Sequence, residues 1–353
     1  MRYELKHRPL TPEELRDRAP EIEREGREPP AQLTSFVTGT ETPRPKVAVH
    51  RTGDGWLVDV EVNGAKVAHR AGRSEETIPR PSHRRGPLQL DGFVPAHAAV
   101  RLTPETAMPA PRKRLIGKKG EFTPLGVFPP DGRTLLTDKS YPWRCTGLVT
   151  TSDGEAGSGV LVGDRLVLTA HHLRPSVSIG NGSWWVSFAP EYDNGNGAFG
   201  ASDVSDLRHY DAESDDDYRV GHDYMLCRLF EPIGVHCGYL GSTVFADSWR
   251  GQQVWANVGY PKDVGGGQRP AVQWGQSMED DYEDDNGQII ETEASLNHGN
   301  SGGPFFSTFD DGNTRLCGVV SGEGSFDGDV DNALASGEDM VALIDGGRAD
   351  WPA

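Results

Sequence analysis

The chain has 353 residues, of which 53 are Asp or Glu and 35 are Lys or Arg, so its formal net charge is −18. An acidic surface repels phosphate backbones, so we expect no nucleic-acid partner. Only 35% of the residues are hydrophobic, while 44 are glycine and 25 are proline. This composition favours a turn-rich β protein joined to an extended proline-rich part over a chain packed throughout.

The first 120 residues differ in composition from the rest and are predicted to form a separate N-terminal region. A short helix is expected over residues 11–19, with Thr11 as N-cap, Pro12 at the first helical position and Pro20 ending it. Residues 46–69 alternate apolar and polar positions around two turn signals, at 53–55 and 63–64, and predict a small β-meander. Residues 70–119 show little periodicity and are interpreted as linker or pro-segment.

Two roles for residues 1–120 remain open: a pro-segment that covers an active-site cleft, or a docking region that recruits a partner or target. The amino terminus has no apolar core of a signal peptide, so none is expected, and the compartment stays open. No run of 18 apolar residues predicts a membrane span.

From residue 121 to 353 the pattern is that of a β protein. Residues 159–170 predict a hairpin with its turn at Gly163-Asp164, and residues 254–258, 289–293 and 316–321 predict further strands. Long amphipathic helices are absent from the pattern. An antiparallel barrel or sandwich follows, and the length suits two barrels.

No cofactor or metal site is expected. The four cysteines, Cys145, Cys227, Cys237 and Cys317, lack metal-site spacing, and if oxidised they allow three pairings between which the sequence does not choose. The acidic runs at 215–217 and 279–285 lack a fixed ligand spacing and are interpreted as solvated charged loops.

Three short segments contain the candidate catalytic residues, and the functional interpretation depends on all three being present. Segment 167–173 reads VLTAHHL and ends an apolar strand with histidine, a general base near neutral pH. Segment 221–229 reads GHDYMLCRL and places Asp223 before an apolar strand, where a carboxylate can orient a histidine ring. Taken singly, these two would be read as an ordinary loop histidine and a turn aspartate.

The third segment, 299–304, reads GNSGGP and is the most specific. Its glycines allow a tight turn that exposes the hydroxyl of Ser301 and aims the amides of Gly299 and Ser301 into one concavity, an oxyanion hole. A serine hydroxyl needs a base, and the base needs an orienting group. The sequence contains all three groups: the serine hydroxyl, a histidine as base and an aspartate to orient it.

These segments resemble those of the trypsin-like (chymotrypsin-fold) serine proteases. The resemblance implies two six-stranded antiparallel β-barrels, a triad of His172, Asp223 and Ser301, and peptide hydrolysis through an acyl-enzyme. Segment 318–321, GVVS, is similar to the strand whose serine supports the buried aspartate and whose backbone binds substrate. Closer similarity to the bacterial glutamyl endopeptidase branch, whose members are secreted and carry a pro-segment, is seen at residues 131–144, 231–234, 238–241, 259–263 and 273–274.

Several positions depart from that family. Asn300 replaces the aspartate that pairs with a new amino terminus, so activation by that ion pair is not expected, although residues 112–114 (RKR) offer a processing site. Val320 stands where the branch has its glutamate-reading histidine, and Ser295 where trypsin has an aspartate. Leu173 replaces the cysteine that follows the family histidine.

A pocket lined by Ser295, Leu296 and Val320 predicts an uncharged residue at P1, because burying an unpaired substrate charge is unfavourable. Ser321 is assigned to the substrate-binding strand, and His298 could line the cleft. His171 is expected to be structural, since it would point away from its neighbour on a strand.

The rival interpretation from another class is a catalytically silent binding protein on a protease scaffold, since fold alone does not fix function. An esterase is the weaker alternative, because its serine elbow would lie between a strand and a helix.

Overall fold

A computed structural model describes residues 5–27, 46–52, 55–61, 69–79, 86–108, 127–128, 130–176, 184–195, 197–211, 220–279, 281–284, 287–324 and 331–352. The predicted turn at 63–64, the basic run at 112–114 and the acidic run at 215–217 lie outside them. Within these ranges, no helix is both long and apolar enough to cross a membrane.

Six antiparallel strands close into the first barrel, as expected. They follow the order β10-β7-β8-β9-β12-β11, and β11 pairs back onto β10. The predicted hairpin is present as β8 and β9. The strands are β7 (Thr146–Thr151), β8 (Ala156–Gly163), β9 (Leu166–Thr169), β10 (Val186–Pro190), β11 (Ser202–Tyr210) and β12 (Met225–Leu229).

The second sheet contains the other predicted strands but does not close. Its hydrogen-bonded path runs β16-β17-β20-β19-β18-β14-β15-β6-β5. The sheet stays open because β15 pairs onward with β6 and β5 and not with β16. The all-β trypsin-like class is confirmed with one closed barrel. The strands of this path are β5 (Thr106–Ala107), β6 (Thr134–Leu136), β14 (Trp255–Gly259), β15 (Ala271–Gln276), β16 (Asp281–Asp284), β17 (Gly287–Thr292), β18 (Pro304–Thr308), β19 (Thr314–Gly324) and β20 (Asp331–Gly337).

One predicted loop is therefore a strand. The acidic run 279–285 contains β16, which pairs in antiparallel register with β17. β16 and β17 add to an edge of the second sheet, and backbone pairing there outweighs the charge pattern.

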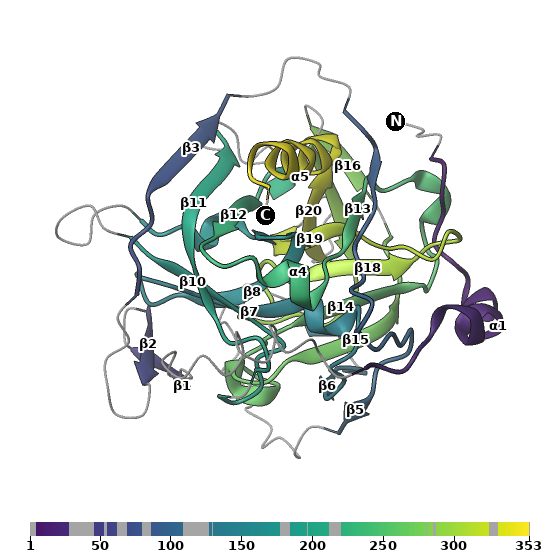
Figure 1. Ribbon diagram of the computed structural model, residues 1–353, viewed down its shortest axis with the longest axis horizontal. Coiled ribbons are helices and arrows are strands. Elements are labelled where there is room, and N and C mark those ends of the chain that lie inside the picture. Colours follow the sequence, from purple (N-terminus) through teal and green to yellow (C-terminus); the bar gives the residue numbers. More distant parts are fainter. Residues whose placement is uncertain are drawn as a thin grey trace.

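The N-terminal region contributes strands to both sheets (Figure 1). The predicted meander begins with a two-stranded hairpin of β1 (Lys46–Thr52) and β2 (Gly55–Glu61). Within residues 70–119, interpreted from the sequence as linker or pro-segment, three short strands pair with the two sheets. There, β3 (Ser74–Ile78) pairs with β11, β4 (Gln89–Leu90) with β13 (Gly241–Thr243), and β5 with β6. Such short segments carry too little periodicity to be recognised.

Two helices differ from expectation. The helix α1 (Pro12–Ile22) begins at the predicted cap, where Thr11 and Glu14 form a capping box, but continues past Pro20 to Ile22. Because Pro20 lies in the last turn, it removes only one helical hydrogen bond. The helix α5 (Glu338–Asp350) was not predicted, since the glycines at 346 and 347 interrupt its apolar pattern. The shorter helices are η1 (Trp143–Cys145), η2 (His171–Leu173), α4 (Ile233–Cys237), η3 (Asp247–Trp249) and η4 (Gly265–Gly267).

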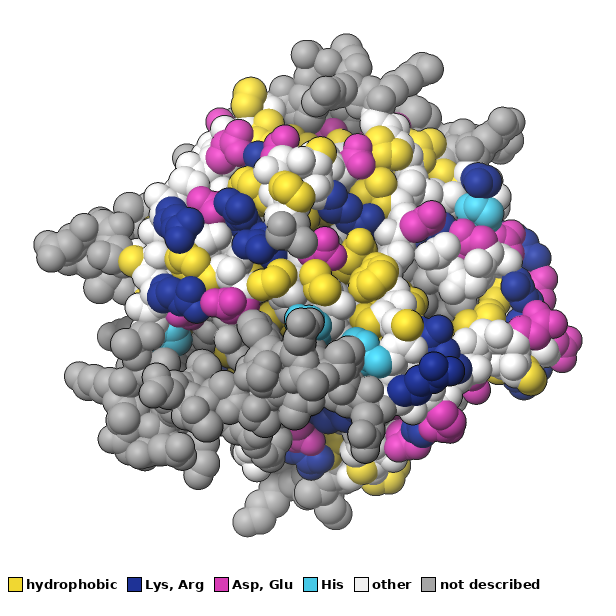
Figure 2. Space-filling model, viewed as in Figure 1, with side chains coloured by type: hydrophobic (Ala, Val, Ile, Leu, Met, Phe, Trp, Pro, Cys, Tyr) yellow, Lys and Arg dark blue, Asp and Glu magenta, His cyan; other side chains and the backbone are white. Residues whose placement is uncertain are grey.

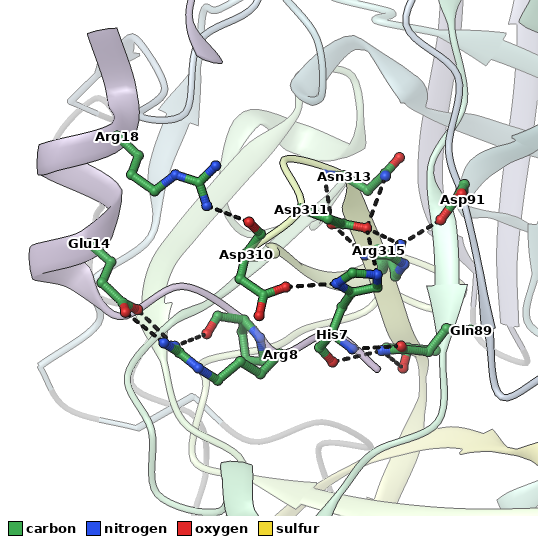
Figure 3. Close-up of polar contacts among 12 residues, drawn as sticks. His7, Arg8, Glu14, Arg18, Gln89, Asp91, Asp310, Asp311, Asn313 and Arg315 are labelled. Carbon is green, nitrogen blue, oxygen red and sulfur yellow. Dashed lines mark hydrogen bonds and ion pairs between the residues drawn. The ribbon is translucent and has the colours of Figure 1, made fainter. Parts of the chain in front are cut away.

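The first described residues are anchored on the β18–β19 hairpin, as Figure 3 shows. His7 Nδ1 lies 2.9 Å from a carboxylate oxygen of Asp310, and Leu10, which is 1% exposed, donates its amide to Thr308. Arg315 donates two hydrogen bonds to Asp311. His7, Asp310 and Asp311 bring ligand-type atoms within 4.8 Å of one another. Because Arg315 already neutralises Asp311, this group is an ion-pair network.

Two large apolar clusters fill the molecule. One joins the first barrel to the near face of the second sheet and to α5, and the other fills the second sheet. The four cysteines are free and buried in these clusters or beside them. On the face drawn in Figure 2, acidic and basic side chains are interspersed and do not form one acidic field.

Candidate active site

The histidine and the aspartate are brought together by neighbouring strands of the first barrel. His172 lies in η2, directly after β9, and Asp223 precedes β12, which pairs with β9. His172 Nδ1 lies 2.7 Å from Asp223 Oδ2, and the backbone amide of His172 donates to Asp223 Oδ1 over 2.8 Å. One carboxylate therefore fixes both the ring and the backbone of His172.

A third group completes the aspartate's surroundings from the second sheet. The hydroxyl of Ser321, on β19, donates to Asp223 Oδ2 over 2.6 Å. Asp223 thus accepts three hydrogen bonds in a buried position, which favours its ionised form. This contact also joins the first barrel to the second sheet at the site.

The Ser301 loop is held against the end of β9. The Ser301 carbonyl accepts from the amide of Ser158 on β8 over 2.8 Å, and the amide of Gly302 donates to Val320. Gly302 has φ +77°, and a Cβ placed there would lie 2.7 Å from the amide nitrogen of Ala170, two residues before His172. The structure therefore places the Ser301 backbone beside the segment that leads into His172, with the Ser301 side chain partly exposed.

The two backbone amides assigned to the oxyanion hole donate no hydrogen bond to a described residue. Gly299 has φ +97°, and a side chain there would strike the carbonyl of Tyr260, so only glycine fits. Within the described part of the chain, neither the Gly299 amide nor the Ser301 amide donates a hydrogen bond. Amides left free beside a serine hydroxyl are what oxyanion stabilisation requires.

Asn300 serves the loop itself and is 1% exposed. Its side-chain oxygen accepts from the amide of Asn297 over 3.1 Å, and its side-chain nitrogen donates to Asn257 over 3.2 Å. The sequence identified the departure from the family aspartate but not the partner, which lies on β14.

The three residues expected to line the P1 pocket are fully buried. Leu296 and Val320 belong to the apolar cluster of the second sheet. The hydroxyl of Ser295 accepts from the amide of Phe128 and donates to its carbonyl, each over 3.0 Å. Ser295 thus ties residues 127–128, near the start of the predicted protease domain, to this wall.

His298 is half-buried, and its carbonyl accepts from the amide of Lys262 over 2.8 Å. His298 therefore lies in the loop that leads to Gly299. The pattern missed Ser158, whose hydroxyl donates to the Gly299 carbonyl over 2.6 Å and accepts from the amide of Tyr260 over 2.9 Å. No motif marks Ser158, because its role depends on a loop more than 100 residues away.

The pKa values of the neighbouring residues His171 and His172 are shifted in opposite directions. Burial alone would lower the pKa of His172, but the charge of Asp223 and its hydrogen bond hold that pKa above the ordinary value. Burial would raise the pKa of Asp223, but His172 and Ser321 hold it below the ordinary value. Burial, and then His209, lower the pKa of His171 to about 4, so His171 is neutral near pH 7.

Comparisons with known proteins agree with this fold. Residues 157–319 match the family model described as a trypsin-like peptidase domain. A Glu endopeptidase structure aligns over 64% of this chain and 100% of its own, with 19% identity and a TM-score of 0.51.

Two other solved structures are similar over 59% of this chain. The thermostable serine protease AL20 from an extremophilic microorganism aligns over 98% of its own chain with 19% identity and a TM-score of 0.44. The protease Anisep from Arthrobacter nicotinovorans aligns over 97% with 17% identity and a TM-score of 0.42. No curated protein sequence matches this chain. The family match over residues 157–319 and the trypsin-like fold together support a serine endopeptidase.

Proposed function

We propose that Ser301 is the nucleophile of this protease and that His172 and Asp223 complete its triad. Ser301 attacks the carbonyl carbon of a peptide bond while His172 Nε2 takes the hydroxyl proton. The carbonyl oxygen becomes an oxyanion held by the amides of Gly299 and Ser301. His172 then returns the proton to the leaving amine, and water hydrolyses the acyl-enzyme by the same steps.

The observation that carries this proposal is the arrangement around Asp223. The carboxylate binds Nδ1 of His172 over 2.7 Å, which keeps the proton on Nδ1 and leaves Nε2 free to accept. The ring is 44% exposed, so substrate can reach it. Every reacting group comes from the protein, so the mechanism needs no cofactor.

The three residues expected to line the P1 pocket support a preference for substrates with an uncharged P1 residue. Leu296 and Val320 are apolar, and the Ser295 hydroxyl is already bonded twice to Phe128. A charged P1 side chain would be buried there without a described partner of opposite charge, which is unfavourable. A peptide-library cleavage profile tests this preference. Dominant cleavage after Glu, Lys or Arg would contradict it.

The nucleophile is tested by labelling with a fluorophosphonate probe. Ser301→Ala should abolish both labelling and turnover of casein, since no oxygen remains to attack. Ser176→Ala is the matched control, because Ser176 is an exposed hydroxyl four residues after His172 that contacts Asp153. Labelling that persists in Ser301→Ala would exclude Ser301 as the nucleophile.

A further inference from the structure

A strand from the N-terminal region forms an extra edge of the first barrel. β3 pairs in parallel with β11 from Asp206↔Ser74 to Tyr210↔Ile78, outside the six closed strands. Figure 1 shows β3 lying along β11. The Gly72 amide donates to Trp184 over 2.9 Å, the Arg73 amide to Ser205 over 2.6 Å, and the Ser74 hydroxyl to Asp206 over 2.6 Å.

This strand carries a carboxylate to the helix that contains His172. Glu75 Oε1 accepts from Arg174 Nη1 over 2.5 Å and from His209 Nε2 over 2.9 Å. Arg174 is the C-cap of η2, and its backbone amide donates to His171. Glu75 therefore ties the end of η2 to β11.

A second path leads from Glu75 to the start of η2. The ring of His209 packs on the ring of His171, with centroids 4.5 Å apart. Among the described residues, the buried Nε2 of His171 finds no hydrogen-bond partner. Packing against His209 therefore orients this ring, and Glu75 holds His209.

The helix η2 has few internal restraints. It spans three residues, and its N-cap, Ala170, offers no side-chain hydrogen bond. Asp223 holds His172 and the apolar cluster holds Leu173, whereas Arg174 contacts Glu75 directly and His171 packs on His209, which Glu75 contacts. A displacement of about 1 Å at a reacting group can lower a rate about 100-fold.

We propose that Glu75 is a positioning residue for the catalytic histidine, and that the strand around it remains part of the active enzyme. The inference rests on the proposed role of His172. It implies that residues 69–79 stay bound to the protease domain even if the chain is cut further along.

The test compares two neighbouring acids of β3 in the full-length chain. Glu75 faces Arg174 and His209, whereas Glu76 pairs with Arg208 over 2.7 Å and its side chain is 55% exposed. Glu75→Ala should lower kcat and the rate of fluorophosphonate labelling about tenfold each with KM unchanged. Glu76→Ala should leave all three within about twofold.

Two further variants keep the test decisive if Glu75→Ala does not fold. Glu75→Gln should fall between wild type and the alanine variant, because its side-chain oxygen can still accept from Arg174 and His209 but no longer carries a charge. Glu75→Ala combined with Arg174→Ala should be no slower than the slower single variant, since both act through one contact. Folding is checked by thermal melting.

A folded Glu75→Ala enzyme with wild-type kcat would overturn the inference, as would an equal loss in Glu76→Ala or a Glu75→Gln enzyme slower than Glu75→Ala. Mass spectrometry of the labelled native enzyme should find residues 69–79, and their absence would also refute it. Failure of the proposed function looks different, because then the Ser301→Ala chain would label like wild type.

Discussion

Replacing Asp223 by Asn tests the whole proposed site with one atom changed. The carboxylate accepts hydrogen bonds of 2.7 Å from His172 Nδ1, 2.8 Å from the His172 amide and 2.6 Å from Ser321. An asparagine retains an oxygen for the amide but can turn an NH₂ group toward Nδ1. The ring then carries its proton on Nε2, which can no longer accept from Ser301.

We expect kcat to fall by about 10⁴-fold, which is roughly 5.5 kcal/mol in the activation free energy. Ser321→Ala is the control, because it leaves the charge and the His172 contacts in place. It should lower the free energy of unfolding by about 1.5–3 kcal/mol, the worth of a hydrogen bond to a charged group, and kcat by about tenfold or less.

The assay is steady-state cleavage of a fluorogenic peptide chosen from the cleavage profile, with thermal melting to confirm folding. A folded Asp223→Asn enzyme that keeps more than about a tenth of wild-type kcat would refute the tautomer argument. A larger loss in Ser321→Ala than in Asp223→Asn would refute it too, because orientation of the ring would then not depend on the carboxylate.

The remaining predictions concern the loop and the pH dependence. Asn300→Asp places a carboxylate in a site 1% exposed, 3.2 Å from the Asn257 side-chain oxygen; the free energy of unfolding in urea should fall by roughly 2–4 kcal/mol at pH 7. That loss should shrink as the pH falls and the new carboxylate is protonated, and a loss independent of pH would contradict the argument. Gly302→Ala should lower kcat/KM at least about 100-fold, because its Cβ would lie 2.3 Å from the Ser158 carbonyl oxygen at φ +77°. Gly312→Ala is the control, because Gly312 has a similar φ of +83° but open space around it, and it should keep wild-type kcat/KM. Equal losses in both variants would mean that the positive φ, and not the contact with Ser158, causes the loss. Because the pKa of His172 is raised and the base must be neutral, the acid limb of the kcat/KM profile should lie above the ordinary histidine pKa of about 6.5. The His172–Asp223 pair should stabilise the fold most between the ordinary pKa values of aspartate, about 3.9, and histidine, about 6.5, and less as the pH rises through the raised pKa of His172 or falls through the lowered pKa of Asp223. An acid limb of kcat/KM below pH 6 would contradict the raised pKa of His172.

The sequence by itself indicated the fold class and the three segments of the site, because both depend on local pattern. Glycines around a serine, a histidine that ends an apolar strand and an aspartate that precedes another can be recognised without knowing what they contact. The strands β8, β9, β14, β17 and β19 followed from alternation and turns in the same way, whereas the six-stranded barrel was an implication of the family resemblance.

The tertiary structure decided which distant residues hold those segments. The bonds of Ser158 to the Gly299 carbonyl, of Asn300 to Asn257 and of Ser295 to Phe128 join positions far apart in the chain, and none has a local signature. The same holds for β3, a five-residue strand without alternation. Its pairing to β11, and the contact of Glu75 with Arg174, exist because residues 206–210 of β11 extend beyond the pairing that closes the barrel onto β10.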